Sequence, residues 1–321
     1  MKISVIIPVR NGAQTLATCL EAIRTQTIKD IEIIILDSKS EDISKEIAVN
    51  YEAKVIDIPD GTFNHGLTRN IGTVVASGEF LFYTVQDARL AENDMLEKMV
   101  KHFEAEAVMG VVGHQAIPWG HADKNPAYWF KRYTEPELQE RYFPENSFER
   151  LSQNQQFQLS GWDDVVAMYR HSALIDTPFK ETNFSEDWLW VTDALKKGYK
   201  LISDPSIVVY HYHHLDFNYR FKTQFTVNYH FYKYFNQIPK VPLSPMKFIR
   251  AGYTIIKRNS ISVIKKPYWV MHNLGINLAD FFSNLSFRAL LLFGGNKLLD
   301  RGYHFFCKNV PQGKIKNGFE A

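Results

Sequence analysis

The sequence predicts an α/β domain with a mainly parallel sheet, and three observations support this fold class. Predicted strands and helices alternate over roughly the first 85 residues. The predicted strands are nearly continuous apolar runs, which is typical of strands that are buried on both faces. The chain has 321 residues, of which 45% are hydrophobic, so it can bury a large core and is too apolar for a disordered chain.

The elements follow in a clear order. Pro8 stops the first apolar run, and Leu16, Leu20 and Ile23 repeat with helical spacing on one face of the next segment. The first part is expected to hold strands at 2–9, 31–36, 54–58 and 79–85, and helices at 13–25, from Ser40 onward, and at 68–76. The later part is expected to hold a strand at 165–169, a helix at 188–197 that Gly198 ends, and a strand at 207–210.

Residues 110–159 are polar and aromatic with little periodicity, so we expect an insertion or a substrate-binding flap there. Three prolines, Pro239, Pro242 and Pro245, indicate a domain boundary. We therefore predict one domain over residues 1–238 and a basic, aromatic helical extension over residues 239–321.

The charge of +2 is unevenly distributed. Residues 241–321 carry a net charge of +9, and residues 1–240 carry −7. Basic residues among aromatic and aliphatic neighbours suit an interfacial helix on the anionic inner leaflet of a membrane. One alternative is a solvated helical cap. The other is a dimer interface, which would make the protein a homo-oligomer.

Several classes of protein are disfavoured. Two distant cysteines exclude a disulfide scaffold and a cysteine-based zinc site, and they fit a reducing cytoplasm. The first apolar stretch is too short for a signal peptide, and no apolar run approaches the length of a membrane span. The chain has no P-loop motif. Nucleic-acid binding is disfavoured because the basic excess lies among long apolar stretches.

Ligands of such sheets bind outside the carboxyl ends of the strands, so the residues that follow each strand are site candidates. Asp37 follows the second strand, and its carboxylate can accept a hydrogen bond from a base or a ribose. The alternative is an N-cap for the next helix. Asp87 follows a very apolar strand and is well placed to hold a divalent cation on phosphate oxygens; the alternative is a turn aspartate.

Two further carboxylates and a histidine cluster are candidates. Glu186 and Asp187 are flanked by aromatic residues, which favours a general base with a raised pKa; the alternative is a helix cap. His211 and His213 share a face at the end of a strand, and imidazoles bind Mn²⁺ or Zn²⁺; the alternative is a structural role.

Arg69 lies in a segment with a glycine-containing turn at a helix start, which can hold a diphosphate. The alternative is an ordinary arginine on a helix surface.

In chain order, these segments resemble the inverting GT-A glycosyltransferases of family 2 over about residues 1–235. The matching motifs are Val5-Ile-Ile-Pro-Val-Arg-Asn11, Asp37-Ser-Lys-Ser-Glu-Asp42, Gln86-Asp87-Ala88, Glu186-Asp187 and Pro205-Ser-Ile-Val-Val-Tyr-His211. The segments Phe63-Asn-His-Gly66, Arg69-Asn70 and Trp162-Asp-Asp164 are similar to the rhamnosyltransferase-like subgroup, which often builds bacterial O-antigen or capsule. Two departures stand out: the metal motif keeps one carboxylate, and Arg10 replaces an aromatic residue.

The resemblance implies a GT-A fold with a donor half at about 1–110 and an acceptor half at about 111–238. It implies transfer of a sugar, such as L-rhamnose, from a dTDP- or UDP-linked donor to a glycan or polyprenyl-linked acceptor, with inversion. It implies Mg²⁺ or Mn²⁺ as cofactor and a cytoplasmic enzyme peripheral to the membrane. The implied roles are Asp187 as general base; Glu186, Trp162, Asp163 and Asp164 at the acceptor; Pro8, Asn11, Asp37, Arg69 and Gln86 at the nucleotide; and Asp87, His211 and His213 at the metal.

Two other functions stay open from the sequence. A non-catalytic nucleotide- or sugar-binding protein on the same scaffold is favoured by the weakened metal motif, whereas retention of Asp187 and His211 argues against it. A metal-dependent hydrolase is disfavoured because the histidine cluster lacks a carboxylate-rich partner.

Overall fold

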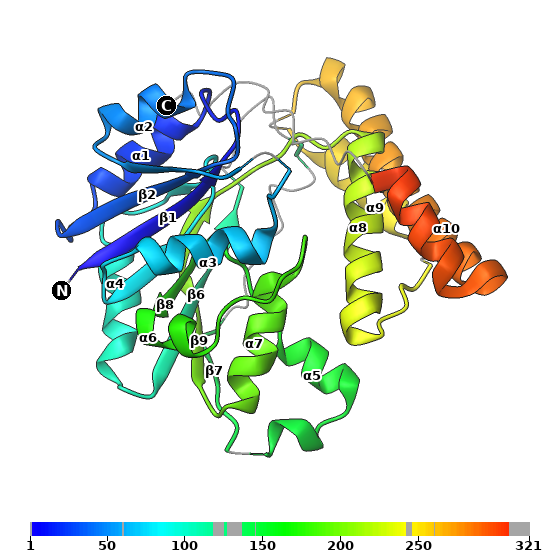
Figure 1. Ribbon diagram of the computed structural model, residues 1–321. Coiled ribbons are helices and arrows are strands. Elements are labelled where there is room, and N and C mark those ends of the chain that lie inside the picture. Colours follow the sequence, from blue (N-terminus) through cyan, green and yellow to red (C-terminus); the bar gives the residue numbers. More distant parts are fainter. Residues whose placement is uncertain are drawn as a thin grey trace. The chain divides into compact units, whose positions relative to one another are not determined.

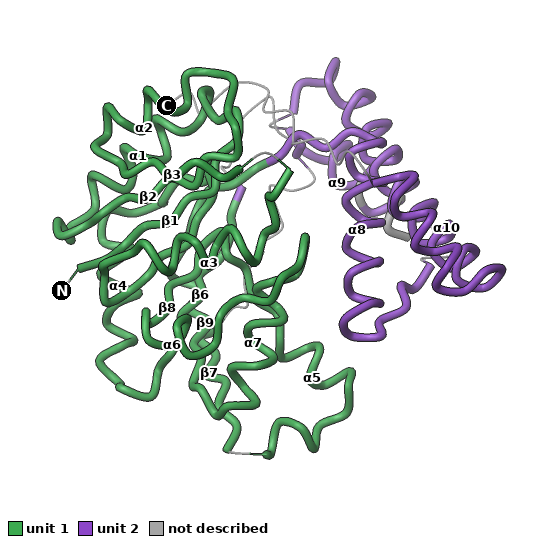
Figure 2. The backbone as a smooth tube through the Cα atoms, in the orientation of Figure 1, with its two compact units in different colours: residues 1–116, 133–212, 317–321 green, residues 117–132, 213–316 purple. Residues whose placement is uncertain are grey.

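The computed structural model describes residues 2–59, 61–117, 125–126, 137–144, 146–241, 246–259 and 261–307. The chain divides into two compact units (Figure 2). The first contains residues 1–116 and 133–212, and the second contains residues 117–132 and 213–316. The helix α8 (Phe217–Phe235), which the sequence grouped with the first domain, belongs to the second unit. The predicted domain boundary at residue 238 itself stays a prediction.

The first unit is built on one sheet, to which nine strands of the described residues belong, in the order β3-β2-β1-β4-β8-β6-β9-β5, with β7 paired to β9 (Figure 1). The neighbours β1, β2, β3 and β4 are parallel, and β8 runs antiparallel to β4 and β6. The strands are β1 (Ile3–Val9), β2 (Ile31–Asp37), β3 (Lys54–Asp57), β4 (Phe80–Tyr83), β5 (Arg89–Leu90), β6 (Val108–Ala116), β7 (Gln139–Arg141), β8 (Ala167–Arg170) and β9 (Lys200–Tyr210). The predicted mainly parallel α/β fold is confirmed.

Helices pack on both faces of this sheet, as the alternation along β1 requires. Ile3, Val5 and Ile7 point into one core, which α1 and α4 complete, whereas Ile6 points into the other core, which α6 and α7 complete. The helices of this unit are α1 (Leu16–Arg24), α2 (Ser44–Asn50), α3 (His65–Val75), α4 (Met95–Lys101), α5 (Gln153–Leu159), α6 (His171–Asp176) and α7 (Glu186–Lys196).

The predicted insertion at 110–159 is wrong at both ends. Its first residues belong to β6, and its last residues form α5. The two glycines of β6 weaken its strand pattern in sequence. Gly113 is required by close packing, since a Cβ there would come within 2.5 Å of Ile207 and 2.8 Å of Val166. Residues 118–124, 127–136 and 145 of the predicted flap lie outside the described residues.

Some predicted boundaries also shift. Helix α2 begins at Ser44 instead of Ser40, because residues 40–42 bind neighbouring loops. Helix α3 begins at His65 instead of Thr68, because the Asn64 side chain accepts a hydrogen bond from the Leu67 amide and caps the helix. Strand β9 begins at Lys200 instead of Ile207.

The helices that the structure describes in the second unit are α8, α9 (Met246–Lys257) and α10 (Lys266–Cys307), with a short 3₁₀ turn at Val263–Lys265. Helices α8 and α10 share a core that includes Phe225, Phe287 and Leu299. Gly295 has φ +58°, so α10 turns there, and its last part folds back until Gly302 meets Leu290. The segment from Val263 to Cys307 is long and apolar enough to cross a membrane by length and composition alone.

The cysteines lie one in each unit. Cys19 is buried in α1, and Cys307 is buried at the end of α10. Burial raises the pKa of both thiols. Neither is disulfide-bonded.

Candidate active site

The loops that follow β1, β2 and β4 are bound to one another at the carboxyl edge of the sheet. Asn11, which has φ +50°, donates its amide to Ser40 Oγ (2.9 Å), and its side-chain oxygen accepts from the Glu41 amide (2.8 Å). The Gly12 amide donates to Ser44 Oγ at 2.7 Å. These bonds fix the backbone after Pro8 against the loop after β2 and form a rigid rim beside Asp37.

Asp37 lies at the end of β2, fully buried and opposite Val9 of β1. Its Oδ1 accepts from the Ser40 amide at 3.0 Å and lies 3.7 Å from Lys45 Nζ. The carboxylate therefore organises the turn after β2 rather than capping α2, which begins seven residues later.

Gln86 connects the loop after β4 to the loop after β1. Its Oε1 accepts from the Arg10 amide at 2.8 Å, and its Nε2 donates to the Arg10 carbonyl at 3.2 Å. Gln86 thus positions backbone next to the predicted nucleotide site.

Asp87, His211 and His213 are close enough to bind one metal ion, since each offers a ligand atom and these atoms lie within 4.8 Å of one another. Asp87 Oδ1 lies 3.4 Å from His211 Nε2. Burial alone would lower the pKa of His211, but Asp87 and Asp163 outweigh it and raise that pKa. One carboxylate and two imidazoles fit a divalent ion such as Mn²⁺ better than Ca²⁺, which prefers oxygen ligands.

Gln115, on β6, links this group to Asp163. His211 Nδ1 donates to Gln115 Oε1 at 2.7 Å, and Gln115 Nε2 donates in turn to Asp163 Oδ2. Because Nδ1 donates to Gln115, Nε2 of His211, which faces Asp87, is the ring nitrogen that can lose its proton and bind a metal ion. Gln115 therefore sets the tautomer that a metal ligand needs.

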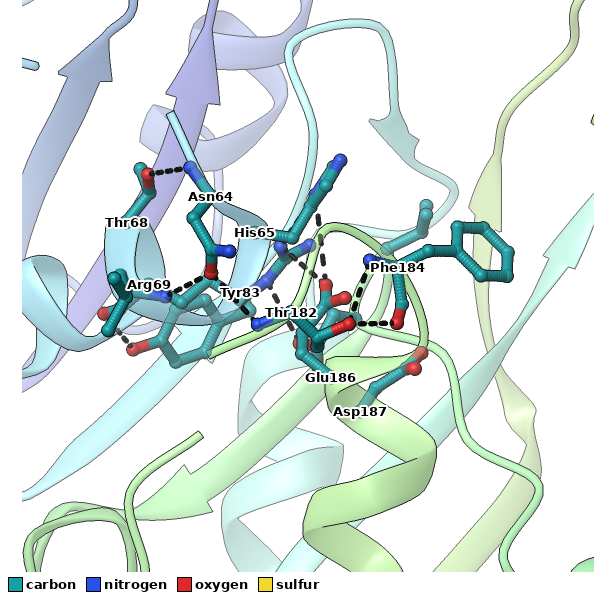
Figure 3. A network of polar contacts seen from close by, with 12 residues as sticks. Asn64, His65, Thr68, Arg69, Tyr83, Thr182, Phe184, Glu186 and Asp187 are labelled. Atoms are coloured by element: carbon teal, nitrogen blue, oxygen red, sulfur yellow. Dashed lines mark hydrogen bonds and ion pairs between the residues drawn. The ribbon is translucent and has the colours of Figure 1, made fainter. Parts of the chain in front are cut away.

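A second polar cluster lies beside the start of α7 (Figure 3). The Arg69 guanidinium, on α3, contacts Asp164 Oδ2 at 2.9 Å and Glu186 Oε1 at 2.6 Å. All three side chains are buried. Asp164 also accepts from the hydroxyl of Tyr169, which accepts in turn from the Trp162 indole at 2.7 Å.

This burial bears on three predicted roles. Arg69 is paired with two carboxylates, and Trp162 is buried against the aromatic rings of Tyr169 and Trp190. Neither placement favours contact with a diphosphate or stacking on a sugar, so those roles stay predictions. Asp164 likewise faces Arg69 inside the protein.

Asp187 lies in the first turn of α7, next to Glu186 and half-buried (Figure 3). Burial raises its pKa well above the ordinary range of an aspartate, and the charges of Glu186, Asp164 and Asp163 raise it further. Burial likewise raises the pKa of Asp164 to about 7, although Arg69 opposes this shift. A carboxylate with a raised pKa can act as a general base near neutral pH.

The loop before α7 packs directly on the start of α3. Asn64 Oδ1 accepts from the Thr182 amide at 3.0 Å, and a Cβ on Gly66 would come within 1.8 Å of the Lys180 carbonyl oxygen. Only glycine fits at position 66. The turn that the sequence offered as a diphosphate site is therefore occupied by the protein's own chain.

No role is predicted from the sequence for Gln115, His65 or Tyr169. Gln115 falls within the predicted flap, and the apolar run that precedes it in β6 is the signal that could have placed it on a strand. His65 Nδ1 accepts from Arg69 at 3.2 Å, one helical turn away.

Comparison with known proteins identifies the family. Residues 4–177 match the model of glycosyl transferase family 2. The O-antigen chain rhamnosyltransferase RfbN of Salmonella typhimurium is 26% identical over 298 residues, which is 88% of each chain. The O-antigen chain rhamnosyltransferase WbaN of Salmonella anatum is 29% identical over 215 residues, which is 65% of this chain and 66% of its own.

Two solved structures share the fold. The mannosyltransferase PcManGT from Pyrobaculum calidifontis, in complex with GDP-Man and Mn²⁺, has a TM-score of 0.54 at 16% identity and covers 95% of this chain and 80% of its own. S. aureus TarS 1–349 in complex with UDP has a TM-score of 0.51 at 17% identity, and the match covers 90% of this chain and 92% of the TarS chain. Both likenesses confirm the predicted GT-A fold. With its family model matched over more than half its length, this chain belongs to glycosyl transferase family 2.

Proposed function

We propose that this protein is an inverting, metal-dependent glycosyltransferase that moves a sugar from a nucleoside diphosphate to a glycan or polyprenyl-linked acceptor in the synthesis of a bacterial surface polysaccharide. L-Rhamnose on dTDP or UDP is the proposed donor, because two relatives are named O-antigen chain rhamnosyltransferases. We propose that the reaction takes place in the cytoplasm.

One observation carries this proposal. A continuous polar path runs from Asp87 through His211 and Gln115 to Asp163, whose charge raises the pKa of Asp187. The group suited to a metal reaches Asp163 through Gln115, and the carboxylate suited to remove a proton interacts with the charge of Asp163. A protein that only binds a nucleotide does not need a carboxylate with a raised pKa, so Asp187 favours an enzyme over a non-catalytic binding protein.

In the proposed reaction, Asp187 accepts the proton of an acceptor hydroxyl while that oxygen attacks the anomeric carbon. The new C–O bond forms as the bond to the diphosphate breaks, and the diphosphate oxygen keeps the electron pair. A single displacement of this kind inverts the anomeric configuration. Arg69 acts as a positioning residue, because it holds Glu186 and so fixes the first turn of α7.

The nucleotide would lie on the rim formed by the loops after β1 and β2, next to Asp37 and Asn11. Asp87, His211 and His213 would hold Mg²⁺ or Mn²⁺ on the diphosphate. A bound divalent ion supplies charge neutralisation for the departing nucleotide. Asp163, which accepts from Gln115, would contact the acceptor.

The proposal predicts how the pH profile responds to Glu186→Gln. Glu186 is the charge with the largest effect on Asp187, and it raises the pKa of that carboxyl. Without that charge, Asp187 loses its proton at lower pH, so the acid limb of kcat/KM should move to lower pH. Asp193→Asn, on the same helix but paired with Lys180, should leave the limb in place. A limb that stays fixed in Glu186→Gln would show that Asp187 is not the titrating base.

Calorimetric titration with dTDP and with UDP tests the donor site. We expect binding in the micromolar range that strengthens with Mn²⁺, and the preferred base identifies the donor nucleotide. Asp87→Ala should abolish the effect of Mn²⁺, and Gln115→Leu should raise the half-saturating Mn²⁺ concentration roughly 10- to 100-fold, as expected for a group that orients a ligand.

The matched control for this titration is Asp94→Ala, an aspartate at the start of α4 that pairs with Lys98. It should bind nucleotide and Mn²⁺ like the wild type. Failure of both nucleotides to bind, with and without Mn²⁺, would contradict the proposed donor site. Tight binding with no response to Mn²⁺ would contradict the proposed metal group alone.

A further inference from the structure

The second unit exposes an apolar face on α9, the 3₁₀ turn and the first turns of α10. Val263 and Ile264 at the turn are 77% and 89% exposed, which is unusual for adjacent aliphatic side chains. On α9 the exposed apolar residues recur every three or four positions and so form one stripe. We define the interfacial face as Ile249, Tyr253, Ile256, Val263, Ile264 and Tyr268.

A small hydrophobic core lies behind the interfacial face and fixes its orientation. Ile255, Ile261 and Trp269 are buried together between α9 and α10. Lys266 Nζ donates to the Ile256 carbonyl at the end of α9 at 2.7 Å, which fixes the turn. The stripe therefore does not result from a frayed segment, because its opposite side is packed.

The charge around this face has one sign. Residues 246–279, which contain the face, hold six lysines and arginines and no aspartate or glutamate. Arg250, Lys257 and Lys265 are exposed, and Lys257 Nζ lies 5.0 Å from the centre of the Tyr253 ring. Positive charge thus borders the apolar side chains directly.

We propose that the interfacial face docks this protein on an anionic lipid bilayer, with Val263 and Ile264 inserted among the acyl chains and the lysines at the headgroups. Exposed aliphatic and aromatic residues bordered by cations are what such a surface binds. A second copy of the chain fits less well, because it would bring cations against cations.

Peripheral docking is also favoured over insertion of α10 across the bilayer. Asp280, in the middle of α10, pairs with Arg220 of α8 at 2.5 Å, and Asn284 accepts from Asn228 at 2.7 Å. Ionised and polar side chains of this kind are costly at the centre of a bilayer. They stabilise packing between α8 and α10 instead.

Flotation of the full chain with lipid vesicles tests the proposal. We expect binding to vesicles of 70% phosphatidylcholine and 30% phosphatidylglycerol, weak binding to pure phosphatidylcholine, and release by 0.5 M NaCl. Val263→Ser with Ile264→Ser should weaken binding at least about 10-fold. Lys257→Gln with Lys265→Gln should weaken it about 25-fold, at roughly 5-fold per charge.

The controls are Val74→Ser, which changes a valine that is 75% exposed on α3, and Lys101→Gln, which changes an exposed lysine on α4. Both should float like the wild type, and all variants should keep nucleotide binding, so a failure here is separate from a failure of the proposed function. No binding to anionic vesicles would overturn the proposal. So would resistance to salt, which indicates an inserted α10, or a change only in oligomeric state on replacing Val263 and Ile264.

Discussion

Asp187→Asn should lower kcat by about 10²- to 10⁴-fold, the range typical of a lost general base. Asparagine keeps the size of the side chain in the first turn of α7 but cannot accept the acceptor's proton. The effect should fall on kcat, with nucleotide binding unchanged, because the proposed mechanism assigns Asp187 to the acceptor and not to the nucleotide. Initial rates of dTDP release from dTDP-L-rhamnose, with a polyprenyl-linked glycan as acceptor, provide the measurement.

Asp193→Asn is the matched control, since it removes a carboxylate from the same helix while leaving the first turn intact. Its rate should stay within about 2-fold of the wild type, as expected for a partly exposed ion pair. If Asp187→Asn retained more than a tenth of the wild-type rate, another group would have to take the proton.

Arg69→Gln should destabilise the protein by about 3–5 kcal/mol, the usual result of removing one partner of a buried ion pair. Asp164 and Glu186 are both almost completely buried, and glutamine supplies no positive charge to either. The free energy of unfolding from urea titration provides the measurement. Lys98→Gln breaks exposed pairs with Glu92 and Asp94, and it should cost at most about 1 kcal/mol.

The pH dependence of this loss has a definite sign. In the wild type, the pKa of Asp164 is already raised to about 7, and Arg69 lowers it. Without Arg69 that pKa rises further, so the ionised form becomes more costly in the folded state. The loss of stability in Arg69→Gln should therefore be larger at pH 8 than at pH 5.

A double variant keeps this prediction testable if Arg69→Gln does not fold. Asp164→Asn removes one of the two stranded carboxylates, so Arg69→Gln with Asp164→Asn should be more stable than Arg69→Gln alone. A single variant that loses less than about 1 kcal/mol would mean that water or another cation reaches the two carboxylates.

The sequence was sufficient to place the rim of the site. Asp37, Asp87 and Asn11 each follow an apolar run, and the carboxyl ends of parallel strands meet at one edge. The order of β1, β2 and β4 did not need to be known for this inference, because every such loop reaches the same edge. The predicted strand ends were correct to within about two residues there.

The second cluster could not be derived in the same way. The guanidinium of Arg69 pairs with Asp164 and Glu186, which are 95 and 117 residues further along the chain. No local sequence pattern predicts pairs at such separations. An arginine in the first turn of a helix predicts a phosphate ligand, whereas the fold buries the Arg69 side chain. Gln115 was missed for a related reason, since two glycines in β6 hide the strand that carries it.

The two buried thiols report on the opening of the two units separately, through the rates at which they are alkylated. Alkylating reagents attack thiolates, and burial both shields each sulfur and raises its pKa, so labelling requires the surrounding helix to open. The labelling rate of Cys19 reports the opening of the first unit, and that of Cys307 reports the opening of the second. Mass spectrometry of the peptides that contain each cysteine measures the two rates separately. Bound nucleotide should slow the labelling of Cys19 alone, whereas vesicles should slow the labelling of Cys307.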